Sequence, residues 1–352
     1  MMMSVVLIAL LDATGLHAQE SSWTARWGLS LQTRYDDNPL RLNAWEKANL
    51  AARLPRFTGM DRADDVLGMI RLRGDFRGDG LGSRPARIGA DVRLDGHAWN
   101  RQGLRFSVGA SASQELTRRD EVGVFLAFTP SEFQRNYLVG TDETGAPAYV
   151  EGVGRRLRGG IEYTREILRG SRGGPELDAN LSVLGTMRRF QDFPWRDRTE
   201  LGARIGLDFQ PVDALETEIA ATLARTSHAR LAEPVSRSDG VTMAATRRDY
   251  VQREVGAEAG LHLGAGRLLT VGYDRRHRSY LATLDEDPVY GDRRDNRDSY
   301  EAALRLDLGP LVRLTLGGSL EEQSTNRPGS GDTGDEADYE RHTLFLRLEL
   351  RR

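Results

Sequence analysis

The residues best suited to chemistry in this sequence are a few histidines that lie close to an acid or a serine. A histidine beside a carboxylate can act as a general acid or base, and one beside a serine can activate the hydroxyl for nucleophilic attack. These pairs are the candidates for hydrolytic chemistry. They are Asp95 with His97, Ser227 with His228, and His277 with Ser279.

The same search excludes most cofactor-dependent chemistry. The chain has no cysteine, which excludes disulfides, thiolate metal sites, iron–sulfur clusters and thiol catalysis. The histidines show no metal-ligand spacing, and the glycines at 152–154 lack the strand–turn–helix context of a phosphate-binding loop. Because isolated acid–histidine pairs are common by chance, the sequence predicts no enzyme, no cofactor and no metal site.

The bulk composition limits the kind of protein that positions these side chains. The chain has 352 residues, a net charge of −3 and 29% charged residues, with a mean hydropathy of −0.51. No apolar run approaches the roughly 18 residues that a transmembrane helix needs, and the charge does not suit a nucleic-acid binder. The 38 glycines disfavour a helical fold.

Alternation of apolar and polar residues runs along most of the chain. In residues 23–35 one phase holds Trp, Ala, Leu, Thr and Tyr, and the other holds Thr, Arg, Gly, Ser and Gln. Since successive strand side chains point to opposite faces, the pattern predicts strands with one apolar and one polar face. There are about fourteen such segments, at 23–35, 66–77, 86–98, 103–117, 121–129, 157–168, 176–190, 199–210, 214–227, 249–263, 267–282, 298–308, 312–323 and 340–351.

The lengths of these segments and of their connections predict an all-β transmembrane antiparallel up-and-down barrel. A 13-residue strand spans about 43 Å, or about 33 Å of height at a tilt of about 40°, which exceeds an apolar band of about 25 Å. Long connections fall at 36–65, 130–156, 228–248, 283–297 and 324–339. With both termini in the periplasm, all of them lie on the extracellular side, as in outer-membrane barrels.

The N-terminal 18 residues resemble a secretory signal peptide. A short apolar core, Val5 to Leu11, is followed by Gly15 to Ala18 and then by polar residues. We therefore expect export and a single barrel domain, 19–352, in the bacterial outer membrane. An ordinary buried N-terminal strand is the alternative.

The polar phase of the strands predicts two charged walls inside the barrel. Facing walls of opposite charge set up a transverse field that selects and orients charged or dipolar solutes, whereas the alternative is a lattice of ion pairs that makes a narrow barrel rigid. The basic wall, on the first four strands, is Arg26, Arg34, Arg71, Arg73, Arg77, Arg87, Arg93 and Arg105. The acidic wall, on strands eight to ten, is Glu200, Asp208, Glu216, Glu218, Glu254 and Glu258.

Aromatic residues and one short helix complete the predicted barrel. Trp23, Trp27, Tyr35 and Tyr300 stand in the apolar phase near strand ends, where membrane interfaces favour aromatic rings. Residues 43–54 read as a helix stopped by the proline at 55. This helix lies either in the lumen as a constriction or over the mouth of the barrel.

Two resemblances follow from these residues. Tyr35-Asp36-Asp37-Asn38-Pro39 resembles the Tyr-Asp-(Asp/Ser)-Asn motif near the start of several outer-membrane β-barrel families, including a porin family often found near exopolysaccharide genes. Asp95 with His97, and the adjacent acids 36 and 37, resemble part of the active site of omptin-type barrel proteases. A barrel phospholipase would require a serine and a histidine accessible to lipid, but neither enzyme family's strand number or full motif is met.

The sequence therefore leaves three functional hypotheses. The first is a porin-like channel for small polar or charged solutes, with the lipid bilayer and those solutes as its partners. The second is the barrel subunit of a larger outer-membrane assembly for polysaccharide or protein export, or a conduit for a cytochrome. The third is a soluble or periplasmic β-rich binding protein. No nucleic-acid partner is expected.

Overall fold

The structure is a computed structural model that describes most of the chain after residue 22. It covers residues 23–52, 57, 62–100, 104–141, 147–170, 174–193, 196–228, 235–236, 242–243, 248–264, 266–283, 290–326 and 338–351. The predicted signal peptide, 1–18, lies outside these residues.

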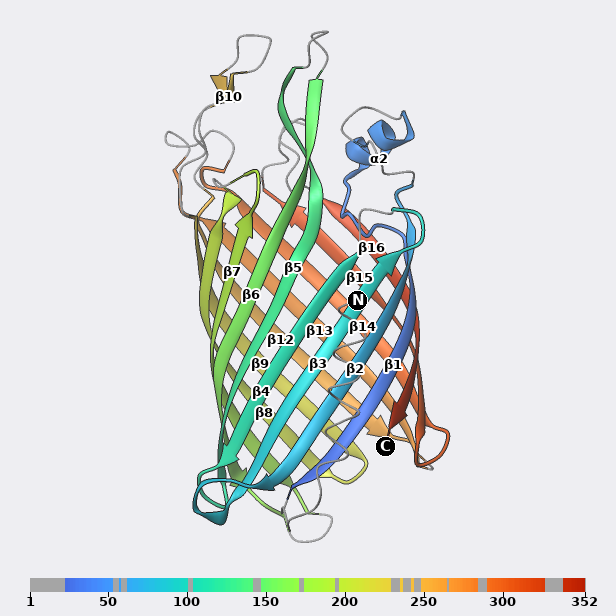
Figure 1. Cartoon of the computed structure of the whole chain (residues 1–352), viewed down its shortest axis with the longest axis vertical. Helices are drawn as coiled ribbons and strands as arrows, with labels where there is room; N and C mark the ends of the chain where they lie inside the picture. Colours follow the sequence, from blue (N-terminus) through green and yellow to red (C-terminus); the bar gives the residue numbers. More distant parts are fainter. Residues whose placement is uncertain are drawn as a thin grey trace.

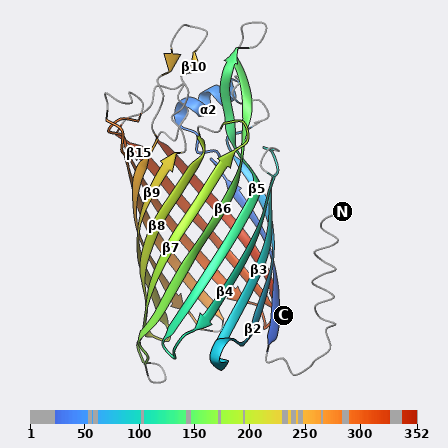
Figure 2. The same cartoon turned by 60° about the vertical axis from the view of Figure 1, so that its left-hand side comes forward.

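Within these ranges, fourteen antiparallel strands form one closed barrel (Figures 1 and 2). In chain order they are β1 (Thr24–Asp36), β2 (Asp65–Asp79), β3 (Pro85–His97), β4 (Arg105–Glu115), β5 (Asp120–Thr141), β6 (Pro147–Leu168), β7 (Glu176–Phe190), β8 (Arg198–Val212), β9 (Leu215–His228), β12 (Tyr250–His262), β13 (Arg267–Tyr280), β14 (Arg294–Asp307), β15 (Val312–Thr325) and β16 (Tyr339–Arg351). The barrel closes where β1 pairs with β16, from Gly28 opposite Arg351 to Asp36 opposite Thr343. Closure leaves no unpaired sheet edge.

The connections differ in length at the two ends of the barrel. At one end, here the turn end, strands are joined by segments of two to seven residues, namely 80–84, 116–119, 169–175, 213–214, 263–266 and 308–311. A short helical turn, η2 (Leu81–Ser83), occupies the first of these. At the other end, the loop end, connections reach 28 residues, at 37–64. The first strand begins and the last strand ends at the turn end (Figure 1).

The predicted fourteen-strand barrel is thus confirmed, with one clear error. We predicted a loop at 130–156, but β5 and β6 are both 22 residues long and continue as a hairpin beyond the barrel rim (Figure 1). Their pairing shifts register at three places, between Thr129 and Glu132, Phe133 and Asn136, and Leu138 and Gly140. Each bulge reverses the inside–outside phase, so the alternation is lost although the strand continues. A two-stranded sheet of β10 (Val235–Ser236) and β11 (Thr242–Met243) also lies in a predicted loop.

The barrel is apolar outside and polar inside, the inverse of a soluble protein. Leu201 and Leu344 on the outer face are 64% and 65% exposed. The apolar cluster of buried residues that the structure describes lies instead at the loop end, where Leu42, Leu50 and Phe57 pack together. A surface this rich in exposed apolar residues requires an apolar environment around it.

The predicted helix is confirmed as α2 (Ala44–Ala51). Asn43 caps it in a capping box, since its Oδ1 accepts from the Glu46 N–H at 2.8 Å and the Glu46 carboxylate accepts from the Asn43 N–H at 3.2 Å. The helix lies beyond the barrel rim at the loop end (Figures 1 and 2). The helix therefore lies over the mouth of the barrel and not in the lumen.

Candidate functional site

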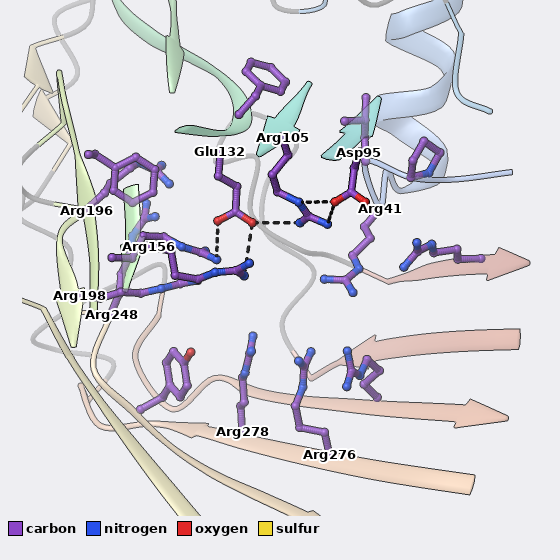
Figure 3. A pocket seen from close by; sticks show the side chains of 18 of the residues that line it. Arg41, Asp95, Arg105, Glu132, Arg156, Arg196, Arg198, Arg248, Arg276 and Arg278 are labelled. Carbon is purple, nitrogen blue, oxygen red and sulfur yellow. Dashed lines mark hydrogen bonds and ion pairs between the residues drawn. The ribbon is translucent and has the colours of Figure 1, made fainter. Parts of the chain in front are cut away.

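A cavity inside the barrel near the loop end is lined largely by arginine (Figure 3). Its volume is about 580 Å³, within the range of small-molecule sites. Twelve of its 25 lining residues are arginines and only two, Asp95 and Glu132, are acidic. The arginines are Arg34, Arg41, Arg105, Arg156, Arg188, Arg196, Arg198, Arg248, Arg276, Arg278, Arg297 and Arg341.

Glu132 holds one group of these arginines together. It directly follows a bulge in β5 that turns its side chain inward. Its carboxylate lies 3.4 Å from Arg105, 3.3 Å from Arg156 and 3.0 Å from Arg188 (Figure 3). Arg105 also contacts Asp95 at 2.6 Å. One carboxylate therefore serves guanidinium groups from three strands, β4, β6 and β7.

A second group surrounds two carboxylates at the barrel seam, where β1 meets β16. Asp36 contacts Arg341 at 2.5 Å and Arg34 at 3.7 Å. Glu321 contacts Arg41 at 3.0 Å and Arg297 at 3.3 Å. Here, too, cationic groups outnumber the carboxylates that they contact.

The donors of this second group are not all used. The Nε–H groups of Arg34 and Arg297 are buried and have no hydrogen-bond acceptor in the part of the chain that the structure describes. A buried N–H without an acceptor costs free energy, and a bound oxyanion would remove that cost. The cavity therefore combines excess positive charge with available donors.

Tyrosines form the wall of the cavity between the two arginine groups. Tyr250 and Tyr280 lie with ring centroids 5.5 Å apart, and Tyr280 and Tyr290 are 5.2 Å apart. Arginines stack on these rings, with Arg278 4.8 Å from the centroid of Tyr250 and Arg248 4.8 Å from that of Tyr290. Stacking fixes the planes of these guanidinium groups in the wall of the cavity.

The eight arginines of the predicted basic wall all lie in the inward phase of β1–β4, but the cavity brings only two of them together. Arg34 and Arg105 line it. Several of the others form short ion pairs nearer the turn end, with Arg71 to Asp91 at 3.4 Å, Arg73 to Asp75 at 3.0 Å and Arg87 to Asp75 at 2.8 Å. Arg93 contacts Asp95 at 2.7 Å, and Arg26 and Arg77 lie near the start of β1 and the end of β2.

The six predicted acidic residues also lie in the inward phase, on β8, β9 and β12. In a fourteen-strand ring β1 stands opposite β8, β2 opposite β9 and β3 opposite β12, so the two sets face each other across the lumen. Five of the six acids contact a polar or charged neighbour. Two form ion pairs, Glu218 with Arg204 at 2.5 Å and Glu216 with His262 at 3.5 Å. Three accept hydrogen bonds, Glu200 from Thr226 at 3.1 Å, Glu254 from Gln252 at 3.2 Å and Asp208 from Asn180. Glu258 lies on β12 between Glu218 and Gly272.

Sequence reasoning missed most of the arginine cavity. Five of its arginines lie on β6, β7, β8 and β13, whereas the predicted basic wall includes the first four strands only. They are Arg156, Arg188, Arg198, Arg276 and Arg278. Their alternation phase was a usable signal, because each of them is in the polar phase close to the loop end of its strand. The arginines of the connections, Arg41, Arg196 and Arg248, gave no such signal.

The predicted aromatic residues lie on the outer face. Trp27, Tyr35 and Tyr300 are 48%, 41% and 47% exposed, and the ring of Trp23 lies against Gly78, where a Cβ would approach within 2.5 Å. Trp23 and Trp27 lie toward the turn end and Tyr35 toward the loop end. Tyr300 pairs with Tyr273 at a centroid distance of 5.1 Å.

The acidic motif at the end of β1 joins the two strands that close the barrel. Asp36 contacts Arg341. Asp37 accepts from the backbone N–H of His342 at 2.7 Å, and its other oxygen lies 2.8 Å from Nδ1 of the same residue. The buried amide of Asn38 donates to the carbonyl groups of Leu42 and Glu340 at 2.9 and 3.0 Å. The motif thus ties β1 to β16 and to the loop that carries α2.

Two of the predicted acid–histidine and serine–histidine pairs are also engaged elsewhere. His97 lies 2.9 Å from Asp65, whose carboxylate also accepts from the backbone of Trp99 and Asn100 at 3.1 Å each. His228 lies 3.2 Å from Asp249. Among the described residues no group of three or more His, Asp or Glu could hold a metal, and no helix has the length and apolar character to cross a membrane.

Comparisons with known proteins give remote structural likeness alone. No family model and no curated protein matches the chain. Solved structures that resemble it include an anion-selective porin from Comamonas acidovorans, at 9% identity and a TM-score of 0.43 over 95% of this chain and 100% of that one. OmpT of Vibrio cholerae has 6% identity and a TM-score of 0.44 over 95% and 99%, and the CymD monoaromatic hydrocarbon channel has 10% and 0.44 over 93% and 88%. At such values no residue role transfers to this chain.

Proposed function

We propose that the chain is a bacterial outer-membrane channel of the porin type that passes small polar or charged solutes and prefers anions. Support comes first from the barrel itself, whose apolar outer face suits lipid and whose charged lumen suits water and solutes. In this proposal the signal peptide directs export, both termini are periplasmic, and the loop end faces the outside of the cell.

The observation that carries the preference for anions is the arginine excess in the cavity at the loop end. Twelve arginines line the cavity, and the ion pairs described above bring four carboxylates to them, so a positive excess remains at physiological pH. Charged rings at a narrow place in a pore attract ions of opposite sign and repel those of the same sign. Anions therefore concentrate at this entrance and cations are depleted.

Transport, rather than catalysis, is the function that we infer for the lumen. The histidines predicted as acid–base candidates on its inner face, His97 and His228, are held by Asp65 and Asp249 at the rim. Asp95 is shared by Arg93 and Arg105. These contacts serve the structure of the rim and the charge of the cavity.

The direct test is single-channel recording of the purified protein in a planar lipid bilayer. We expect discrete current steps in KCl that are ohmic at low voltage. Heat-modifiable migration on a gel shows beforehand that the barrel is folded. A folded barrel that gives no open current at any voltage would overturn the channel proposal.

A barrel subunit of a larger assembly is the second candidate, favoured by one observation. The β5–β6 hairpin extends beyond the rim for several residues on each strand, further than a pore requires. Such a hairpin offers a surface for a partner protein. Purification in mild detergent distinguishes the two, since a solitary particle without any co-purifying chain would count against the assembly.

A further inference from the structure

Three polar residues on the outer face of the barrel form a hydrogen-bonded relay that neither the channel nor the fold requires. His277 lies with Nε2 3.0 Å from Ser279 Oγ and with Nδ1 2.8 Å from Asn296 Oδ1. Both contacts are within the range of good hydrogen bonds. The serine, the imidazole and the amide therefore form one continuous chain of contacts.

The barrel strands position this relay without a loop. Ser279 and His277 are two residues apart on β13, so their side chains share a face, and His277 is the register partner of Asn296 on β14. Their face is the outer one, because Arg276 and Arg278, in the other phase, line the cavity inside. The geometry rests on regular strand pairing.

The direction of the hydrogen bonds suits nucleophilic catalysis. An amide oxygen can only accept a hydrogen bond, so the Nδ1–H of His277 donates to Asn296 Oδ1, and Nε2 is the ring nitrogen that carries the free lone pair. That nitrogen is then free to accept the hydroxyl proton of Ser279. A nucleophile within reach of a base, with the base oriented by a third group, is the general arrangement of acyl-transfer sites.

The relay stands where a bilayer changes from apolar to polar. Along β13 the outward residues run from Leu269 and Val271 through Tyr273 and Arg275 to His277 and Ser279, in the direction of the loop end. Tyr273 and Tyr300 pair below the relay as an aromatic level typical of the membrane interface. The ester groups of glycerolipids lie at this boundary.

Apolar and cationic residues flank the relay on neighbouring positions. Val251 is the register partner of Ser279 on β12, and Leu281, two residues further along, is 38% exposed, so acyl chains have apolar surface beside the serine. Arg253 is the register partner of His277 and Arg294 that of Ser279, and both are exposed. Guanidinium groups at these positions suit a lipid phosphate or a developing oxyanion.

We propose that Ser279, His277 and Asn296 form a catalytic triad that hydrolyses carboxyl esters of glycerophospholipids at the outer face of the barrel. The proposal rests on the membrane location proposed above, but not on conduction through the lumen. The substrate reaches the site from the bilayer, and water is the second reactant.

The reaction balances as two acyl transfers. Ser279 Oγ attacks the ester carbonyl carbon while its proton moves to His277 Nε2, and the C–O bond to the glycerol oxygen then breaks as that oxygen takes the proton from His277. Water next attacks the acyl-serine ester, giving its proton to His277. The fatty acid leaves and the serine regains its proton.

The matched control lies two strands away. Ser227 also lies on the outer face near the loop end, where it is exposed, and it is adjacent in sequence to a histidine. The neighbouring His228 points into the lumen, however, and lies against Asp249. Ser227 thus has the position of Ser279 without its relay.

The experiment uses the full-length folded barrel with a fluorophosphonate probe and with vesicles of phosphatidylethanolamine and phosphatidylglycerol. We expect the probe to label Ser279 and the vesicles to release fatty acid. Ser279→Ala should lose the label and at least about 10³-fold in rate, whereas Ser227→Ala keeps both. Asn296→Ala should lower kcat by about tenfold or more at unchanged KM, and Asn296→Asp should restore most of it.

Heat-modifiable migration and channel conductance of each variant show that the barrel is intact. A wild-type protein that is neither labelled nor active, in vesicles and in detergent micelles, would overturn the triad whatever its conductance. Equal activity of the Ser279→Ala variant would do the same. Loss of conductance with retained labelling would refute the channel alone.

Discussion

At the scale of single residues, the carboxylate of Glu132 offsets part of the positive charge of the cavity. It is the carboxylate shared by Arg105, Arg156 and Arg188. Its inward position depends on a bulge in β5 that the sequence pattern does not reveal. One side chain thus links an irregularity of the strand to the electrostatics of the pore.

Glu132→Gln should destabilise the barrel and increase its preference for anions. Removing a shared carboxylate leaves the guanidinium groups without their counter-charge, which costs about 1–3 kcal/mol at a site partly open to water. The checks are the temperature of heat modification and the chloride-to-potassium permeability ratio. Glu162→Gln, an exposed lumen glutamate on β6, is the control. Equal effects of both changes would contradict this role.

Arg198→Gln and Arg278→Gln should each lower the chloride-to-potassium permeability ratio. Both residues line the cavity. A unit charge about 4 Å from an ion contributes about 1 kcal/mol in water, so we expect each change to lower the permeability ratio by about two- to fivefold. Arg225→Gln changes an exposed outer-face arginine of β9 and should leave the ratio unaltered. Zero-current potentials of the three variants decide the matter.

At the scale of elements, α2 is a small unit whose stability depends on its cap. The helix has eight residues, which is too short to be stable alone, and it is held by the capping box and by Leu42, Leu50 and Phe57. It stands at the mouth of the barrel rather than in the lumen. Changes in the helix should therefore alter the entrance and leave the barrel intact.

Asn43→Ala should destabilise α2 by about 1 kcal/mol because it removes the side-chain acceptor of the Glu46 N–H. Limited proteolysis of the folded protein should then cleave faster within 42–52, while heat-modifiable migration stays unchanged. Asn43→Ser retains a capping oxygen and should restore resistance. A cleavage rate that does not respond to either change would show that packing alone holds the helix.

The alternation of side chains predicted most strands because each meets lipid on one face and water on the other. The range of β7 was predicted to the residue, at 176–190. The alternation does not predict the outer halves of β5 and β6, because three register shifts there interrupt the period of two and no lipid-facing phase remains. Nor does the alternation predict the arginine cavity, because its twelve arginines come from β1, β4, β6–β8, β13–β14, β16 and three connections. Only the closure of the barrel brings them together.

At the scale of the whole molecule, the fold separates two surfaces with different chemistry. The outer face presents apolar residues to lipid and carries the serine–histidine–asparagine relay. The lumen has arginines and acids on facing walls and an arginine excess at the loop end. Because adjacent residues of one strand alternate between the two surfaces, β13 contributes Arg276 and Arg278 to the cavity and His277 and Ser279 to the relay.

The measurement that tests the central claim most directly is the zero-current potential of the wild-type channel across a gradient of KCl. If the arginine cavity selects anions, chloride crosses faster than potassium and the dilute side becomes negative. A dilute side that becomes positive, which would indicate selection of cations, would contradict the account.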